Sequence, residues 1–157
     1  NSLIDKLELA LFAGKIAAYA QGFAVMEAAS REFTWNLPMA TIARIWRAGC
    51  IIRSQFLDTI ASAFEQNKGL SNLLLAPDFV TMMQGATPAL RHIVARGAQE
   101  GLPLPALSSA LAFFDSYRQA RGTANLIQAQ RDFFGAHGFK RLDGEGDFHG
   151  PWGSGNN

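Results

Sequence analysis

The sequence predicts an all-α protein, an irregular multi-helix bundle that ends in an extended glycine-rich tail. Two observations favour helices: apolar residues recur at a spacing near 3.6 along successive segments, and glycine or proline separates these segments. A third observation argues against a sheet, because the chain has no run of alternating β-branched residues bounded by turns. Unequal segment lengths favour an irregular bundle over a regular repeat array.

The first predicted helix begins at a capping box and runs to about Ser30. Asp5 follows Ser2 by three residues, the spacing at which each side chain caps the backbone amide of the other. A near-helical apolar spacing continues through Leu3, Leu7, Ala10, Leu11, Gly14, Ala18 and Val25. Small residues would let other helices approach closely, so we expect a central core helix with contacts at Ala10, Gly14, Ala17, Ala18, Gly22 and Ala28.

The middle of the chain predicts two further helices. Pro38 suits the first turn of the earlier one, which ends at about Gly49. Its apolar residues are Ile42, Ile45 and Trp46. The later helix runs from Cys50 toward Asn67. Its apolar residues are spaced by four, at Ile52, Phe56, Ile60 and Phe64.

Prolines and glycines set the boundaries of the remaining helices. Pro77 and Pro88 mark the starts or kinks of two short helical pieces, and the Gly-Leu-Pro-Leu-Pro run at 101–105 is the clearest breaker. The helix after it carries Leu107, Leu111, Phe114 and Tyr117. A last helix follows Gly122 and ends at about Gly135.

The final twenty residues, 138–157, have a different composition from the helices. They contain six glycines and show no periodic apolar face. A purely solvated linker would rarely carry their large apolar residues, which are Phe139, Leu142, Phe148 and Trp152. We therefore interpret 138–157 as an extended tail that docks on a folded surface, and 1–137 as the helical domain.

Composition excludes several classes of partner. Fourteen basic and thirteen acidic residues give a net charge of +1, which does not indicate nucleic acid or an anionic membrane. The apolar stretch 16–26 is too short, and too polar at its borders, to span a bilayer. Cys50 is the only cysteine, so no intrachain disulfide can form, and we expect a cytoplasmic protein. His92 and His149 have no cysteine or histidine at ligand spacing, so no zinc site is expected.

Other conspicuous residues have a structural interpretation. The arginines Arg44, Arg47 and Arg53 are expected to form a solvated or ion-paired surface. Cys50 lies in an apolar helix and is expected to fill the core. The aromatic residues Trp46, Phe113 and Phe114 are also expected in the core rather than on a base-stacking platform.

Arg131 and His137 are the candidate binding residues. We expect Arg131 in the last turn of the final helix and His137 at or just past its cap, with Gly135 or Gly138 supplying a left-handed turn. On a continuous helix the two would lie about 120° apart, so the chain must turn back for them to converge. A guanidinium fork beside an imidazole suits a phosphate. Alternatively, Arg131 pairs with Asp132 or with helix-end carbonyls, and His137 only caps the helix.

The sequence around these two residues resembles a known family. Residues 125–139 read NLIQAQRDFFGAHGF, which resembles the C-terminal signature of the long-form, decarboxylating 6-phosphogluconate dehydrogenases. Further segments resemble family segments in the same order: GKIAAYAQGFAVMEAA, IWRAGCIIRSQFLDTIASAF, NLLL at 72–75 and SSALAFFDSYR. The resemblance covers nearly the whole chain.

The resemblance implies a role for each part of the chain. Arg131 and His137 would bind 6-phosphogluconate, largely at its phosphate, in the active site of the neighbouring subunit of a homodimer. Residues 1–137 would be the dimerisation and substrate domain, and 138–157 would dock on the partner subunit. NADP would be bound by an N-terminal Rossmann domain that this chain lacks. The parent enzyme would oxidatively decarboxylate 6-phosphogluconate to ribulose 5-phosphate and CO2.

The chain also departs from the family. The general base lysine and the proton-donating glutamate of the family match no segment here, and the glycines at 144–150 depart from a dinucleotide loop in spacing and follow no strand. Phe133 and Phe139 stand where the family often has tyrosine. We therefore expect a piece of a longer enzyme that alone binds no NADP and has no dehydrogenase activity. The alternative is a stand-alone helical homodimer for binding or assembly, without redox activity.

Overall fold

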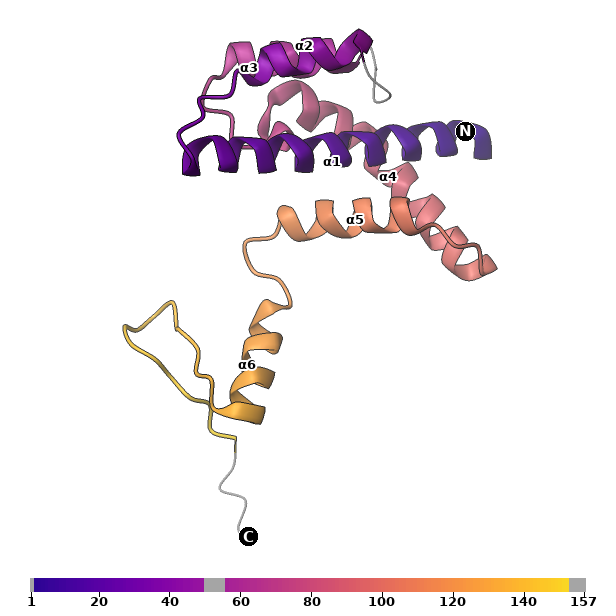
Figure 1. The fold of residues 1–157 in the computed structure, drawn as a ribbon. Coiled ribbons are helices and arrows are strands. Elements are labelled where there is room, and N and C mark those ends of the chain that lie inside the picture. Colours follow the sequence, from indigo (N-terminus) through magenta and orange to yellow (C-terminus); the bar gives the residue numbers. More distant parts are fainter. Residues whose placement is uncertain (1, 50–55, 153–157) are drawn as a thin grey trace. The chain divides into compact units, whose positions relative to one another are not determined.

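The computed structural model describes residues 2–49 and 56–152, which form six α-helices and one short 3-10 helix (Figure 1). No strand occurs among these residues, so the predicted all-α class is confirmed. The chain divides into two compact units, Asn1–Phe114 and Asp115–Asn157, which we call unit 1 and unit 2. The roles predicted for two parts of the chain stay predictions: a substrate domain for 1–137 and a docking tail for 138–157.

Unit 1 is built on the packing of α1 (Leu3–Glu32) along α4 (Pro77–Glu100). The predicted capping box of α1 is confirmed, since the Asp5 amide donates to Ser2 Oγ at 3.1 Å and the Ser2 amide donates to Asp5 Oδ2 at 2.8 Å. Two hydrogen bonds with Ser2 lower the pKa of Asp5: the bond from the Ser2 backbone has the larger effect, and the bond with the Ser2 side chain has the smaller one. The fully buried residues of α1 are mostly alanines and recur every three or four positions along one face. They are Ala10, Ala13, Ile16, Ala17, Ala20 and Phe23.

The predicted apolar stripe of α1 does not coincide with this buried face. Several of its residues are exposed, namely Leu3, Leu7, Leu11, Ala18 and Val25. Gly22 and Ala28, which were predicted to receive neighbouring helices, are exposed as well. The prediction was wrong at these positions because α1 is apolar on more than one face, so spacing alone does not identify the face that α4 covers. Ala10 and Ala17, which were also predicted as contacts, are fully buried. Gly14 does meet a neighbour, because a Cβ there would lie 3.0 Å from Leu107 Cδ2.

The helix α4 corrects a second prediction. Pro77 is at its first turn, as predicted, but Pro88 lies inside it, and 77–100 is one helix rather than two short pieces. Pro88 cannot donate an amide hydrogen bond to the preceding turn. Apolar residues on both sides of the proline are nevertheless buried in the same core, which favours continuation of the helix: Phe79, Met83, Ala86, Leu90 and Ile93.

The helices α2 (Met39–Gly49) and α3 (Phe56–Gln66) lie side by side in Figure 1 and contact each other. Arg44 pairs with Glu65 at 2.5 Å, and Arg47 pairs with Asp58 at 2.7 Å. These pairs confirm the ion-paired interpretation of the two arginines. The predicted start of the second of these helices at Cys50, and the predicted roles of Ile52 and Arg53, lie outside the described residues.

The remaining parts of unit 1 complete its core. The Phe23 ring packs against Trp46 and Phe64 at centroid distances of 5.5 and 5.3 Å, which confirms the core interpretation of Trp46. The short helix η1 (Leu73–Leu75) buries two leucines, and α4 ends at Gly101, whose φ of 69° is left-handed. Helix α5 (Pro105–Tyr117) follows the predicted breaker, and Phe113 and Phe114 pack against the core as predicted.

By length and composition, α1 is the one helix among the described residues that could cross a membrane. An 18-residue window of it has a mean hydropathy of 1.4, and 33% of that window is buried inside the protein. Core helices of globular domains meet the same criterion. The buried alanines of α1 therefore fit its position in the unit 1 core.

Two glycines of α4 should respond in opposite ways to alanine. At Gly97 a Cβ would lie 2.5 Å from Leu104 Cδ1 and 3.2 Å from the Leu102 carbonyl oxygen, so Gly97→Ala should lower the free energy of unfolding by roughly 1–3 kcal/mol. At Gly85 a Cβ would meet nothing within 4 Å, so Gly85→Ala should raise it by about 0.5–1 kcal/mol. Denaturant unfolding of both variants measures the two changes. Equal effects would contradict the packing of α4 against the 101–104 turn.

Candidate functional site

The candidate site lies in unit 2, at the end of helix α6 (Ala124–Gly135). The left-handed residue that ends this helix is Ala136, with φ 50°, rather than the predicted Gly135 or Gly138. Its amide donates to the Asp132 carbonyl at 2.8 Å, which closes the cap. Gly138 is left-handed too, with φ 70°, so the chain turns twice within three residues.

The double turn brings Arg131 and His137 to one hollow of about 340 Å³. Arg131 reaches it from the helix, about one turn before the helix ends, and His137 reaches it from the turn. The His137 ring lies against the backbone of Gly135, since a Cβ at Gly135 would be 2.7 Å from His137 Nε2. The predicted convergence is therefore observed, through a turn at Ala136. We call this pocket the Arg131–His137 hollow; its other lining residues are Ile127, Gln130, Phe134 and Gly135.

The two basic side chains of the hollow are available to an anion. Arg131 and His137 are exposed, and the contact of Arg131 Nη1 with Gln128 Oε1 is long, at 3.5 Å. The alternative in which Arg131 pairs with Asp132 is not observed, because both oxygens of the Asp132 carboxylate accept from other donors. A guanidinium fork and an imidazole at one hollow can bind a phosphate from two directions.

The tail returns to the end of α6 after leaving it (Figure 1). Phe139 and Phe148 exchange two backbone hydrogen bonds of 2.9 Å each, which form an isolated bridge and close the loop between them. The loop contains Gly146, whose φ is 103°, and Arg141, whose guanidinium binds the Asp143 carboxylate at 2.7 and 2.6 Å. The described part of the tail thus docks on its own helix, as an extended segment would, and its docking on a partner stays a prediction.

Asp132 holds this arrangement together. Its Oδ1 accepts from the Gly138 amide at 2.8 Å and from His149 Nδ1 at 2.7 Å. Its Oδ2 accepts from the Gly150 amide at 2.8 Å and from Trp152 Nε1 at 2.5 Å. We call Asp132 and these four donors the Asp132 clamp. The side chain of Asp132 is fully buried, so the four bonds replace its contacts with water.

The clamp fixes the charge of Asp132. The Gly150 amide is the main cause that holds the pKa of the Asp132 carboxyl well below its usual range, and Trp152, His149 and Gly138 act in the same direction. Burial opposes them and is outweighed. Because the carboxylate is ionised at neutral pH and can only accept, His149 donates from Nδ1.

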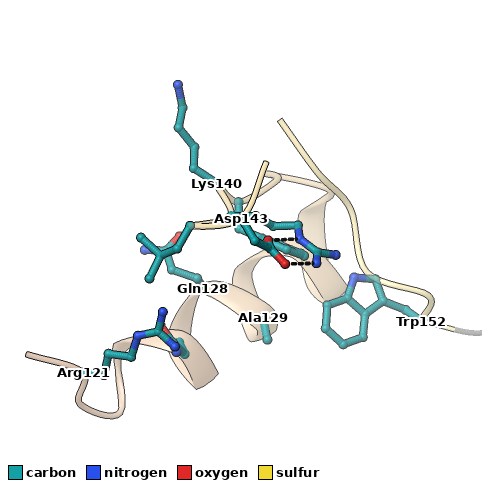
Figure 2. A pocket seen from close by; sticks show the side chains of 10 residues that line it. Arg121, Gln128, Ala129, Lys140, Asp143 and Trp152 are labelled. Atoms are coloured by element: carbon teal, nitrogen blue, oxygen red, sulfur yellow. Dashed lines mark hydrogen bonds and ion pairs between the residues drawn. The ribbon is translucent and has the colours of Figure 1, made fainter. Parts of the chain in front are cut away.

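A second, larger hollow of about 710 Å³ lies between α6 and the tail within unit 2 (Figure 2). Arg121, Lys140 and Trp152 line it, and the dashed contacts at Asp143 in Figure 2 are its two bonds with Arg141. The sequence singled out neither this hollow nor the clamp. The spacing of residues along a helix does not predict that an aspartate will be buried. The available signal was the composition of the tail, because its indole, its ring nitrogen and its glycine amides are the donors that a buried carboxylate needs.

No cluster of three or more histidine, cysteine, aspartate or glutamate residues suited to a metal occurs in the described ranges. His149 is bonded to Asp132, and His92 Nε2 lies 3.3 Å from Lys6 Nζ in unit 1.

Comparison with known proteins identifies similar sequences. Over residues 1–152 the chain matches the family described as the C-terminal domain of 6-phosphogluconate dehydrogenase. The decarboxylating 6-phosphogluconate dehydrogenase of Klebsiella pneumoniae is 54% identical over 149 residues, which are 95% of this chain and 32% of that enzyme. The corresponding enzyme of Staphylococcus aureus (strain N315) is 52% identical over 152 residues, which are 97% of this chain and 32% of that enzyme. The chain therefore spans about a third of the length of these relatives.

A solved structure has a similar fold. The 6-phosphogluconate dehydrogenase of Plasmodium falciparum superimposes with a TM-score of 0.92 and 41% sequence identity, over 97% of this chain and 32% of that one. That enzyme was solved in its apo form, with its cofactor NADP+ and with its substrate 6-phosphogluconate.

Gly135→Ala should move the His137 ring without weakening the fold. The added Cβ would collide with His137 Nε2 at 2.7 Å, and an exposed ring can move away. Alanine also favours a helix over glycine, so the free energy of unfolding should stay level or rise by up to about 1 kcal/mol. NMR of the His137 ring and thermal unfolding measure the two effects. An unchanged ring environment would contradict the contact with Gly135.

The docking of the tail should resist acid until well below pH 4. A carboxyl whose pKa is lowered by folding stabilises the fold above its unfolded pKa of about 3.9, and this contribution is lost as the pH falls through the lower, folded value. The Trp152 indole N–H resonance should therefore keep its docked position from pH 7 to about pH 4 and change only below it. A change with a midpoint above pH 4 would contradict the clamp.

Proposed function

Because this chain belongs to the 6-phosphogluconate dehydrogenase family, as its C-terminal domain, we propose that it completes the substrate site of an NADP-dependent, decarboxylating 6-phosphogluconate dehydrogenase. The parent enzyme would convert 6-phosphogluconate to ribulose 5-phosphate and CO2. Arg131 and His137 would bind the substrate phosphate in the active site of the partner subunit. The observation that carries this proposal is their convergence on one open hollow, in a chain whose Plasmodium falciparum relative binds 6-phosphogluconate.

The Arg131–His137 hollow suits a dianionic phosphate. Arg131 can donate two parallel hydrogen bonds, and the His137 ring, which lines the same hollow, can add a third donor. Asp132 follows Arg131 in the chain, but its carboxylate is buried and satisfied by four donors, so it presents no oxygen to the ligand. Binding and orientation of the phosphate are the contributions that these residues can make.

The described residues do not fit the dinucleotide itself. Gly144 and Gly146 lie in the tail loop closed by the Phe139–Phe148 bridge, Gly150 lies just after this bridge, and no helix begins after these glycines in the described range. A pyrophosphate loop requires a helix N-terminus at that point. We therefore place the NADP site in the remainder of the parent enzyme, and hydride transfer and decarboxylation with it.

Exposed apolar side chains support a homodimer and contact with the rest of the parent chain. Asp132 is the only buried residue of unit 2 within the described ranges, so this unit has no apolar core of its own. Its exposed apolar residues include Leu126, Ile127, Phe133, Phe134 and Leu142. Unit 1 exposes Leu11 and Val25 on α1, at 67% and 68%. Surfaces of this kind are typical of subunit and domain interfaces, and they favour a domain of a longer enzyme over a stand-alone module.

Arg131→Met in the complete parent enzyme should weaken the binding of 6-phosphogluconate by about 2 to 4 kcal/mol, because the aliphatic bulk remains and the phosphate fork is lost. His137→Asn should act in the same direction and less strongly. The Michaelis constant for NADP should change little in both variants. Arg121→Met is the matched control, since Arg121 is an exposed arginine of unit 2 that lines the other hollow.

Steady-state kinetics with 6-phosphogluconate and with NADP measure these effects. An unchanged Michaelis constant for 6-phosphogluconate in Arg131→Met would contradict the proposal and leave Arg131 as a helix-end residue. An equal rise in Arg121→Met would show a general charge effect instead of a phosphate site.

A further inference from the structure

The Asp132 clamp fixes the backbone on both sides of His137. The main-chain carbonyl of Asp132 accepts from the Ala136 amide at 2.8 Å, and its side chain accepts from the Gly138 amide at 2.8 Å. His137 is the residue between these two donors. Asp132, which directly follows Arg131 in the helix, therefore holds the residues on both sides of His137.

The other three of the four donors of the clamp come from the part of the tail beyond the 139–148 loop. His149, Gly150 and Trp152 lie 17 to 20 residues beyond Asp132 and donate to the same carboxylate. The Trp152 ring also meets the Phe133 ring edge-on, at a centroid distance of 6.2 Å. These contacts tie residues 149–152 to α6 and, together with the Phe139–Phe148 bridge, favour the closed form of the double turn.

We propose that Asp132 is a positioning residue for the substrate phosphate, one that holds His137 beside Arg131 through the backbone of 136–138; this rests on the function proposed above. Asp132 does not touch the substrate, because its side chain is buried and both of its oxygens are occupied. Four donors point at its negative charge, which reduces the repulsion between this carboxylate and a phosphate in the hollow. The clamp keeps the hollow formed before substrate arrives, and substrate binding then does not have to order the turn.

Asp132→Asn removes the negative charge of the side chain and keeps its shape. The amide keeps one acceptor oxygen, but its NH2 group would face two of the present donors. At least one of the four bonds is therefore lost whichever way the side chain turns, even if the His149 ring changes tautomer and accepts at Nδ1. In the complete parent enzyme, we expect the Michaelis constant for 6-phosphogluconate to rise about tenfold or more, the scale on which supporting residues act behind a ligand. The Michaelis constant for NADP should stay within about twofold, because the cofactor is bound elsewhere.

Asp143→Asn is the matched control. It makes the same substitution in the same unit, at an exposed carboxylate of the tail that pairs with Arg141 and makes no bond to α6 among those described. Its Michaelis constants should match those of the unchanged enzyme. Trp152→Phe is the milder variant, since it removes one of the four donors and keeps an aromatic ring against Phe133. It should raise the Michaelis constant for 6-phosphogluconate by a few fold, and it decides the question if Asp132→Asn does not fold.

A double-mutant cycle distinguishes positioning from general stability. If Asp132 acts through the Arg131–His137 hollow, Asp132→Asn should have a much smaller effect in an Arg131→Met background than alone. Full additivity, or equal rises in both Michaelis constants, would overturn the inference. The inference also fails if Arg131→Met raises the Michaelis constant for 6-phosphogluconate while Asp132→Asn and Trp152→Phe leave it unchanged. If Arg131→Met itself has no effect, the proposed function fails instead.

Discussion

The arrangement of unit 2 depends on one buried carboxylate. A segment of this size usually folds around apolar side chains, but here the residue that is withdrawn from water is Asp132, and the large apolar residues of α6 lie on the surface. Four donors from the turn and the tail make its burial favourable and set where the turn, the loop and Trp152 lie. A hydrogen-bonded centre is directional, so it specifies a geometry more closely than apolar contacts would.

The two units use different physical means to hold their elements. In unit 1, alanines at Ala10, Ala13, Ala17 and Ala20 let α1 and α4 pack closely around large side chains such as Phe23 and Phe79. Unit 2 has a polar centre, and its large apolar side chains lie on its surface. That inversion is expected of a segment whose apolar surface is covered by other parts of a larger assembly, with the polar clamp preserving its shape.

Much of the fold could be predicted from the sequence, because caps and breakers act locally. The Ser2–Asp5 box, Pro77 and the 101–105 run each determine a boundary through bonds within a few residues, and each appears where it was predicted. Two other predictions failed because they required knowledge of tertiary contacts. Pro88 lies inside α4, where burial on both sides outweighs its local effect, and the wrong face of α1 was assigned to the core.

The candidate site shows the same division between local and long-range information. The spacing of Arg131 and His137 and the glycines around them predicted a turn that would bring the two together. The left-handed position was assigned to a glycine, whereas Ala136 occupies it, held by the Asp132 carbonyl. Three of the four bonds of the clamp join residues that are 17 to 20 positions apart, and local sequence patterns do not predict bonds over that range.

The most direct test of the proposed phosphate site is a crystal structure of the complete parent enzyme with 6-phosphogluconate bound. The account predicts that Arg131 guanidinium nitrogens and a ring nitrogen of His137 lie within about 3.2 Å of the phosphate oxygens. The same structure should show the Asp132 carboxylate bonded to Gly138, His149, Gly150 and Trp152 and turned away from the substrate. A phosphate bound without Arg131 and His137, with the hollow empty or covered by the partner, would contradict it.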